Sequence, residues 1–540
     1  IAAHGPDSVA FYVSGQFLTE DYYVANKLMK GFIGSGNIDS NSRLCMASSV
    51  AGHRRAFGED VVPGIYEDFE EADLVLLVGS NAAWCHPVIH QRLAAARAAR
   101  GTRVVVLDPR RTATAEAADL YLPIAPGSDV LIFQGLLVHL ARAGAIDRAW
   151  AARHTRGLEE ALGAACFDAN EPERVAAEAG VDPEALQTLY DWFAATGRVV
   201  TAFSQGVNQA ADGTDRVNAI INCHLATGRI GRPGMGPFSL TGQPNAMGGR
   251  EVGALATQLA SHIDFADRAA LAAFWRAPNP AAGPGMTATR MFDAIAEGRI
   301  KAIWIAATNP AATLPRAEAV RAALAACPFV VVSDCWETDT TRLAHVVLPA
   351  AGWAEKDGTV TNSERRISRQ RAFRAPPGDA RPDWWMFAQV GRGMGWPEAF
   401  AWASPAAIFR EHAALSGHAN GGRRVFDIAP LADLDDAAYE NLAPLRWPLD
   451  AHGAEGGRLF ARGGFPTAER RARLVPLAWR GRSDAGAAPL LLNTGRVRDQ
   501  WHTMTRTGRV AALAAHTPEP LLAIHPADPA RLGLADGQVA

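Results

Sequence analysis

Residues 73–81 read DLVLLVGSN, a short apolar run that ends in a turn signal. A continuous apolar run of this length is typical of a parallel strand buried on both faces. A helix-forming segment over residues 87–100 follows, and then a second apolar run from Arg103 to Asp108. This strand–helix–strand order predicts an α/β fold with a doubly wound parallel sheet.

The same unit recurs later in the chain. Residues 301–308 predict a strand, Asn309-Pro310 a turn, residues 315–326 a helix and residues 329–334 a second strand. Six positions match at a constant offset of 226 residues: Asp108 with Asp334, Thr112 with Thr338, Thr114 with Thr340, Ala118 with Ala344, Leu122 with Leu348, and Pro123 with Pro349. The matches favour two pseudo-equivalent nucleotide-binding domains over the alternative that any two α/β units look alike.

The rest of the chain is divided around these units. We expect a first α/β dinucleotide-binding region over residues 1–230, beginning at about 40, and a second over 231–385. A further strand over 198–203 and a helix over 214–227 are expected in the first. Residues 386–488 are predicted to be a variable helical and connector region. Residues 489–540 are predicted to begin a C-terminal β-barrel-like domain, because 489–495 and 520–525 have the pattern of strands.

Composition excludes several classes of protein. The 540 residues are 48% hydrophobic and 20% charged, which is typical of globular proteins. A net charge of −3 gives no reason to expect nucleic acid as a partner. No apolar run reaches the ~18 residues of a membrane span.

The six cysteines show no CxxC pair, which indicates a reduced, cytoplasmic protein. Because the chain begins at Ile1 instead of Met, we interpret it as a fragment that lacks both ends.

Polar residues follow the predicted strands at positions suited to nucleotides. Backbone N–H groups in a loop between a strand and a helix bind phosphate, a role that fits Gly79, Ser80 and Asn81. A carboxylate at a strand end, such as Asp108, can accept hydrogen bonds from ribose hydroxyls. Ser333 and Asp334 hold the same places in the second unit, and Ser128-Asp129 could bind a guanine edge. The alternative for each strand-end Asp is a simple turn residue.

Cys45 has a different context from the other cysteines. It comes just before a probable helix, in residues 41–48, NSRLCMAS. A thiolate is stabilised at a helix N-terminus and is a soft metal ligand. The alternative is a small buried hydrophobic residue, which is the usual role of a free cysteine.

Several motifs resemble those of the molybdopterin oxidoreductases, the dimethyl sulfoxide reductase superfamily. They are residues 41–48 (NSRLCMAS), 79–81 (GSN), 241–253 (TGQPNAMGGREVG), 361–366 (TNSERR) and 494–503 (TGRVRDQWHT). Residues 204–209 and 218–228 are similar to the branch that contains the bacterial assimilatory nitrate reductases. The resemblance is weak across 396–488.

The resemblance implies molybdenum held by two molybdopterin guanine dinucleotides, with Cys45 as the protein ligand to the metal. Met46 and Arg250 would lie near the substrate, nitrate. The expected cofactor contacts are Asn41, Gly79, Ser80, Asn81, Asp108, Thr112, Ser128, Asp129, Gln243, Asn309, Ser333, Asp334, Lys356, Asp383, Thr494, Gly495, Arg496, Trp501, His502 and Thr503. The resemblance also implies a [4Fe–4S] cluster on an N-terminal segment missing from this sequence. The electron donor would be ferredoxin, flavodoxin or a nicotinamide-linked reductase subunit.

Four other functions compete with this one. A periplasmic nitrate reductase would carry an export signal. A formate dehydrogenase of this family is expected to have His directly after the ligand cysteine, whereas Met46 stands here. A non-catalytic electron-transfer scaffold would not need Cys45. An ordinary nicotinamide dehydrogenase would carry G-x-G-x-x-G after the first strand, and it does not occur there. For Arg250 the alternative is a structural salt bridge with Glu251 or another acid, and for His502 a packed side chain.

Overall fold

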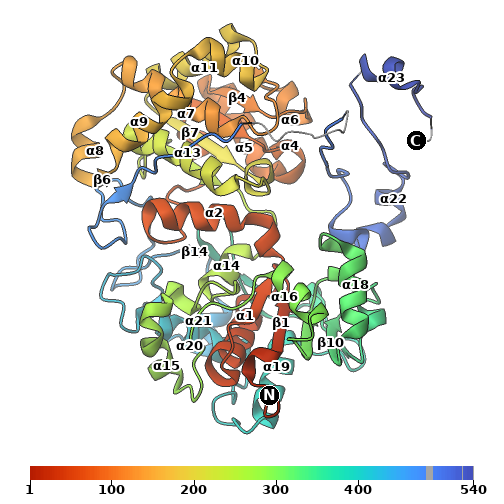
Figure 1. Cartoon of the computed structure of the whole chain (residues 1–540). Coiled ribbons are helices and arrows are strands. Elements are labelled where there is room, and N and C mark those ends of the chain that lie inside the picture. Colours follow the sequence, from red (N-terminus) through yellow and green to blue (C-terminus); the bar gives the residue numbers. More distant parts are fainter. Residues whose placement is uncertain (482–489, 526, 539–540) are drawn as a thin grey trace. The chain divides into compact units, whose positions relative to one another are not determined.

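The computed structural model describes residues 1–481, 490–525 and 527–538. The chain divides into two compact units, residues 1–484 and 485–540 (Figure 1). Two parallel sheets make up the framework of the larger unit. Among the residues that the structure describes, no helix is long and apolar enough to cross a membrane.

The first sheet has the strand order β5-β4-β3-β7-β8, and each strand is parallel to its neighbours. All five residues of β3 are buried, as the continuous apolar run predicted. The strands are β3 (Leu74–Val78), β4 (Arg103–Leu107), β5 (Leu120–Leu122), β7 (Val199–Phe203) and β8 (Gly236–Ser239). Its helices are α3 (Asp68–Glu71), α4 (Ala82–Cys85), α5 (Pro87–Arg100), α6 (Ala113–Glu116), α7 (Asp129–Arg142), α8 (Arg148–His154), α9 (Leu158–Ala169), α10 (Pro172–Ala179), α11 (Pro183–Ala195), α12 (Gln205–Asn208) and α13 (Gly213–Ala226).

The second sheet has the order β11-β10-β9-β1-β2 and is also parallel throughout. Its strands are β1 (Val9–Val13), β2 (Ile38–Ser40), β9 (Ala302–Ala306), β10 (Phe329–Asp334) and β11 (Val346–Pro349). In both sheets three consecutive strands lie in the same order, and two further strands extend the sheet beyond the first of the three; these two come later in the chain in the first sheet and earlier in the second. This pair of five-stranded parallel sheets confirms the predicted α/β fold with two doubly wound sheets. The sequence analysis missed β1 and β2, which join this sheet from the far end of the chain.

The equivalence extends to hydrogen bonds between side chains. Asn81 Oδ1 accepts a hydrogen bond from Thr114 Oγ1 at 2.8 Å, directly after β3. Asn309 Oδ1 accepts one from Thr340 Oγ1 at 2.6 Å, directly after β9. In each unit the asparagine precedes a short helix, and the threonine lies beyond the next strand. The sequence repeat thus reflects the same loop structure built twice.

The remaining elements of the larger unit surround the sheets. Figure 1 shows α2 (Ser42–Phe57) crossing the middle of this unit, and α2 packs against α13. The other helices are α1 (Thr19–Asn26), η2 (Lys27–Ile33, a π-helix), α14 (Ala246–Glu251), α15 (Arg268–Trp275), α16 (Ala288–Ala296), α17 (Pro310–Thr313), α18 (Ala317–Ala326), α19 (Asp383–Gly393), α20 (Pro405–Gly417) and α21 (Asp436–Glu440). Single 3-10 turns are η1 (Pro6–Ser8), η3 (Ala260–His262), η4 (Phe265–Asp267), η5 (Thr341–Leu343), η6 (Trp353–Glu355) and η7 (Ala429–Leu431). The smaller sheets are formed by β12 (Gly358–Thr361), β13 (Arg366–Gln370) and β14 (Leu445–Arg446), and by β6 (Thr155–Arg156) and β15 (Ala472–Arg473).

The smaller unit corrects one prediction. In residues 490–525 and 527–538 no strand forms, so the strands predicted over 489–495 and 520–525 are wrong where the structure describes them; Pro489 lies outside the described residues. Leu492 and Leu521 are 79% and 83% exposed, and an apolar run without a paired strand gains nothing from an extended conformation. The elements found are η8 (His502–Met504), η9 (Thr507–Arg509), α22 (Ala511–Ala514) and α23 (Ala527–Leu532).

Gly79 provides a test of the close packing at the end of β3. Its φ is +52°, and a Cβ there would lie 2.7 Å from Cα of Gly206. We expect Gly79→Ala to lower the free energy of unfolding by about 1–3 kcal/mol more than Gly101→Ala. Gly101 is the matched control, since it also has positive φ (+73°) but no atom within 4 Å of its Cβ position. Urea denaturation measures both variants, and equal losses would contradict the packing argument.

Candidate functional site

The candidate site lies where loops from both sheets meet. Parallel strands place their carboxyl ends at one edge, and ligands bind there in doubly wound folds. Cys45 follows β2 of the second sheet, and Gln243 follows β8 of the first. The backbone N–H of Gly15, after β1, donates to Asn41 Oδ1 at 2.5 Å, and a Cβ on Gly15 would lie 3.4 Å from the Gln243 side chain. The edge loops of the two sheets therefore converge around Asn41 and Cys45.

The Cys45 sulfur is surrounded by hydrogen-bond donors. Gln205 Nε2 lies 3.2 Å from Sγ, and the Gln243 side chain and the Gly242 N–H also donate to it. Burial raises the pKa of the Cys45 thiol, while these donors and the charge of Arg250 lower it. The donors favour the thiolate over the thiol, and the thiolate is the form that binds a metal. The sequence analysis missed Gln205, which lies in the motif over 204–209.

Arg250 is buried beside Met46, as the predicted site requires. Its Nε lies 2.9 Å from Asp60 Oδ2, Nη1 lies 3.3 Å from Met46 Sδ, and Nη2 lies 3.0 Å from Met247 Sδ. The acid that pairs with Arg250 is therefore Asp60 and not Glu251. Burial raises the pKa of Asp60, but the guanidinium more than offsets this and holds the pKa well below its ordinary value.

The first nucleotide region contains buried polar atoms with no partner among the described residues. They are Ser80 Oγ, Asn81 Nδ2 and Thr112 Oγ1, all at the carboxyl ends of β3 and β4. Buried polar groups in proteins are nearly always hydrogen-bonded, so three at one sheet edge leave room for a polar ligand. These residues fit the predicted phosphate and sugar contacts.

Three other predicted contacts of this region already have partners in the chain. Asp108 Oδ1 accepts the N–H of Arg110 at 2.9 Å, and burial raises the Asp108 pKa. Ser128 Oγ donates to the carbonyl of Ala125 at 2.7 Å. Asp129 forms a 2.6 Å ion pair with Arg216. A guanine contact by Asp129 would have to share its carboxylate with this arginine.

The second nucleotide region is centred on a buried lysine. Lys356 Nζ lies 3.2 Å from Asp21 Oδ2 and also donates to Asp383 Oδ2. Burial raises the pKa of Asp383 to about 6 against the lowering effect of Lys356, and Asp383 Oδ1 has no hydrogen-bond partner among the described residues. Ser333 Oγ accepts from Trp304 Nε1 at 3.1 Å. This region, like the first, combines satisfied structural contacts with an open polar atom.

The predicted contacts over 494–503 belong to the smaller unit. The rings of Trp501 and His502 lie 4.5 Å apart, and Arg496 lies over the Trp501 ring at 5.0 Å. The backbone of His502 and Thr503 has positive φ, 31° and 52°. These residues form a local cluster in which His502 packs beside an aromatic ring. Thr494 and Gly495 lie in the same unit.

Comparison with protein families identifies the chain. Residues 1–392 match the family model described as molybdopterin oxidoreductase, and residues 490–540 match that of the molydopterin dinucleotide binding domain. The chain belongs to the molybdopterin oxidoreductase family. The motifs around Cys45, Gly79 and Gln243 lie within the first matched range.

Two nitrate reductases resemble the chain over its whole length. It is 53% identical to a nitrate reductase of Klebsiella oxytoca and 51% identical to a nitrate reductase of Shewanella frigidimarina. The matches include 100% and 99% of this chain but only 62% and 58% of the two relatives, so the chain spans about three fifths of their length. Among solved structures, acetylene hydratase from Pelobacter acetylenicus has a TM-score of 0.71 at 20% identity, covering 100% of this chain and 76% of that one. That similarity shows a shared fold.

The residues of the larger unit fit the cofactor that this family implies. Unpartnered polar atoms occur at Ser80, Asn81, Thr112, Gln243 and Asp383, all expected cofactor contacts. Within the described ranges, no three His, Cys, Asp or Glu side chains gather as a metal site. Gln243, which also donates to the Cys45 sulfur, is one of these expected cofactor contacts, so one of the open polar atoms belongs to a side chain beside Cys45.

Thr112 tests the fit of the first nucleotide region. Its hydroxyl has no partner among the described residues, so Thr112→Val should leave the stability of the cofactor-free protein unchanged. It should reduce the stabilisation that cofactor binding adds by about 1 kcal/mol. Thermal unfolding of loaded and cofactor-free protein measures both quantities. Thr114→Val is the control: its hydroxyl donates to Asn81, so its loss should destabilise both forms alike. An equal effect of Thr112→Val on both forms would contradict the assignment.

Proposed function

We propose that the chain reduces nitrate to nitrite, in nitrate assimilation in the cytoplasm, at molybdenum held by two molybdopterin guanine dinucleotides. The observation that supports this most directly is the buried Cys45 sulfur with its three donors, where the edge loops of the two parallel sheets meet. The names of the two relatives described above support nitrate as the substrate. The buried Arg250 suits an anion.

The chain's own residues would hold the cofactor at three places. Cys45 would bind the metal through its thiolate, and Asn41 and Gln243 would contact the pterin beside it. The first dinucleotide would bind Gly79 to Asn81 with Asp108, Thr112, Ser128 and Asp129, and the second would bind Asn309, Ser333, Asp334, Lys356 and Asp383. Residues 494–496 and 501–503 would add contacts from the smaller unit. When bound, molybdenum supplies two-electron oxygen-atom transfer.

Arg250 would bind nitrate and stabilise the charge that develops as the N–O bond breaks. Its Nη atoms face the sulfurs of Met46 and Met247, which are weak acceptors and compete poorly with an anion. The ion pair with Asp60 holds the guanidinium through Nε and leaves the Nη edge for the substrate. Electrons would arrive from a [4Fe–4S] cluster on a further segment of the protein, reduced by ferredoxin, flavodoxin or a nicotinamide-linked subunit.

Formate oxidation is the second candidate for this site. Met46 after Cys45 disfavours it, and the methionine thioether next to Arg250 cannot accept a proton from formate. A non-catalytic scaffold would not need three donors on a buried sulfur. A periplasmic nitrate reductase would share the chemistry and differ in location.

Purified full-length protein tests the proposal directly. We expect molybdenum and GMP at a ratio of one to two, nitrate reduction with a reduced viologen dye, and no dye reduction by formate. Cys45→Ala should abolish activity, whereas Cys223→Ala, which removes another buried thiol on α13, should retain it. Absence of molybdenum, or formate oxidation without nitrate reduction, would overturn the proposal.

Arg250→Lys tests the anion-binding role separately. Lysine keeps a positive charge beside Asp60, whereas alanine would leave a buried carboxylate unpaired and destabilise the protein. Because lysine lacks the planar guanidinium, we expect kcat/KM for nitrate to fall by about 10²-fold at full molybdenum content. Steady-state kinetics with metal analysis measures this. Unchanged kcat/KM would show that Arg250 has only a structural role.

A further inference from the structure

A group of buried acid–base side chains lies next to Arg250 and has no part in the chemistry described above. Glu251 follows Arg250 on α14 and is fully buried. Its Oε2 accepts a hydrogen bond from Thr361 Oγ1 at 3.0 Å, and its Oε1 accepts one from Trp447 Nε1 at 2.5 Å. The carboxyl group is thus fixed in place but is not neutralised by an ion pair among the described residues.

His262 lies against Trp447, which donates to this carboxyl group, and pairs with a second acid. Its Nδ1 lies 2.6 Å from Glu59 Oε1, while its Nε2 is buried and has no hydrogen-bond partner in the part of the chain that the structure describes. Its ring packs edge-on against Trp447, the residue that donates to Glu251. His262 therefore pairs with the Glu59 carboxylate through Nδ1, while its buried Nε2 is left for a further polar group.

The backbone around His262 is unusual. Ser261 and His262 have φ of 57° and 54°, in the left-handed region that costs L-residues energy. Such strain persists only where the surroundings impose it, and it is concentrated at functional sites. Ser261 Oγ is also buried without a partner among the described residues. Together with His262 Nε2 it provides polar partners for a buried water molecule.

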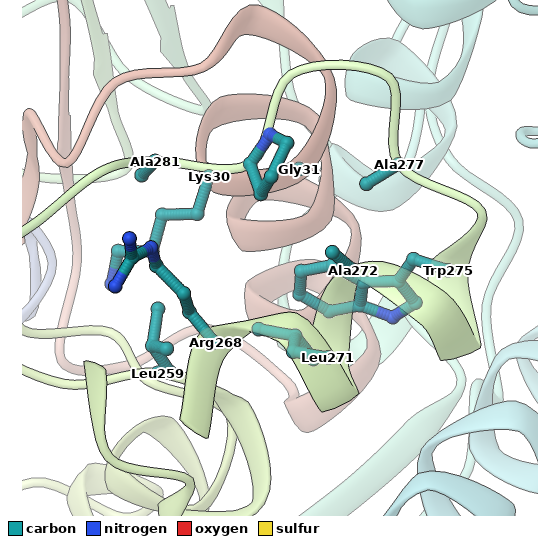
Figure 2. A pocket seen from close by; sticks show the side chains of 10 residues that line it. Lys30, Gly31, Leu259, Arg268, Leu271, Ala272, Trp275, Ala277 and Ala281 are labelled. Carbon is teal, nitrogen blue, oxygen red and sulfur yellow. The ribbon is translucent and has the colours of Figure 1, made fainter. Parts of the chain in front are cut away.

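Contacts of Lys30 and of Glu59 hold these acid–base side chains in place. Lys30, which lines the small pocket in Figure 2 with Leu259, donates from Nζ to the carbonyls of Gly253, Leu255 and Gln258 at 2.5, 3.0 and 2.6 Å. The segment from α14 to His262 is thereby fixed. At the outer end, Glu59 accepts the N–H groups of residues 425 and 426, and residues 421–423 just before them are exposed. Glu59 is only 6% exposed, but the segment that it binds leads directly to these exposed residues, and Glu251 follows Arg250 on α14.

We propose that Glu59, His262 and Glu251 form a proton relay from the protein surface to the space beside Arg250. The inference rests on the proposed function, because nitrate, two electrons and two protons give nitrite and water. Each proton would pass from His262 Nε2 across a bound water to the Glu251 carboxylate, and from there to the oxygen that leaves nitrate. Glu59 would reprotonate His262 from solvent, and the electrons come from the donor.

Other charged or titratable groups face this relay from the surrounding elements. Asp60 and Arg250 form an ion pair beside it, His53 lies beyond Asp60, His412 of α20 lies across Phe426, and Arg424 lies near Glu59. Burial raises the pKa of Glu251 to about 7, against the lowering effect of Trp447 and of the charge on His262. A group with a pKa near the working pH both accepts and releases protons efficiently.

Infrared spectroscopy of the purified protein tests the relay without nitrate turnover. We expect the carbonyl stretch of a protonated carboxylic acid to titrate near neutral pH and a component of it to vanish in Glu251→Gln. In His262→Gln its midpoint should move to higher pH, because the positive charge that lowers the Glu251 pKa is gone. Glu20→Gln is the matched control: Glu20 is another buried carboxyl, with pKa raised to about 7, that accepts from Thr359 and Tyr439. It should leave the His262-dependent component unchanged.

Kinetics of the molybdenum-loaded enzyme provides the second test. We expect Glu251→Gln and His262→Gln to lower kcat by about 10²-fold, with little change in KM, and to increase the solvent isotope effect. Imidazole should partly rescue His262→Ala. His412→Leu is the control, because neither ring nitrogen of His412 has a hydrogen-bond partner among the described residues.

The outcomes separate this inference from the proposed function. If the wild-type protein reduces nitrate but both relay variants keep its kcat and pH profile, the relay is overturned and the function stands. If wild-type protein lacks nitrate activity but the coupled infrared titration appears, the nitrate proposal fails and the coupled acid–base pair is supported. An infrared titration of Glu251 that does not respond to His262→Gln overturns the relay in either case.

Discussion

Every part of the candidate site depends on the parallel pairing of strands in two sheets. Parallel strands joined by helices must all end at the same edge, so the loops that carry function gather there without any contact designed for that purpose. The chain does this twice, in two five-stranded parallel sheets. Cys45 follows the edge strand of one sheet and Gln243 the edge strand of the other, and their loops meet at Gly15 and Asn41. A cofactor with two similar arms matches a protein with two similar sheets.

The sequence predicted β3, β4 and β7 of the first sheet and β9 and β10 of the second, but missed β1 and β2, and the miss has a physical reason. Strands β3 and β9 are apolar throughout because helices cover both faces, and that pattern is visible in the sequence. Strand β2 has only three residues, one of them Asp39, and pairs with β1 across a long helical connection. Nothing local distinguishes it from a loop. The strands predicted over 489–495 and 520–525 failed for the opposite reason, since an apolar run is not a strand until another strand pairs with it.

The same limit applies to the site. Cys45, Met46 and Arg250 were recognised because they lie in motifs, and the structure brings Met46 and Arg250 into contact. Their partners were not recognised, since Gln205 and Asp60 reach them from distant parts of the chain. Glu251 was a natural candidate for the salt bridge with Arg250, but neighbouring residues on a helix point in different directions. On α14 the Arg250 side chain instead reaches the sulfur of Met247, and the Glu251 side chain reaches Trp447.

This separation of Arg250 from Glu251 has an electrostatic consequence. Asp60 already balances the charge of Arg250, so an anion that approaches the guanidinium meets a pair that is nearly neutral overall. An ionised Glu251 nearby would make the region negative and would repel nitrate. Protonation of Glu251 removes that repulsion, and its pKa of about 7 lets proton uptake accompany anion binding. The proposed reaction would consume the anion and protons together. A buried carboxyl group beside a paired arginine can therefore couple substrate binding to proton supply, through the same charges that hold the site together.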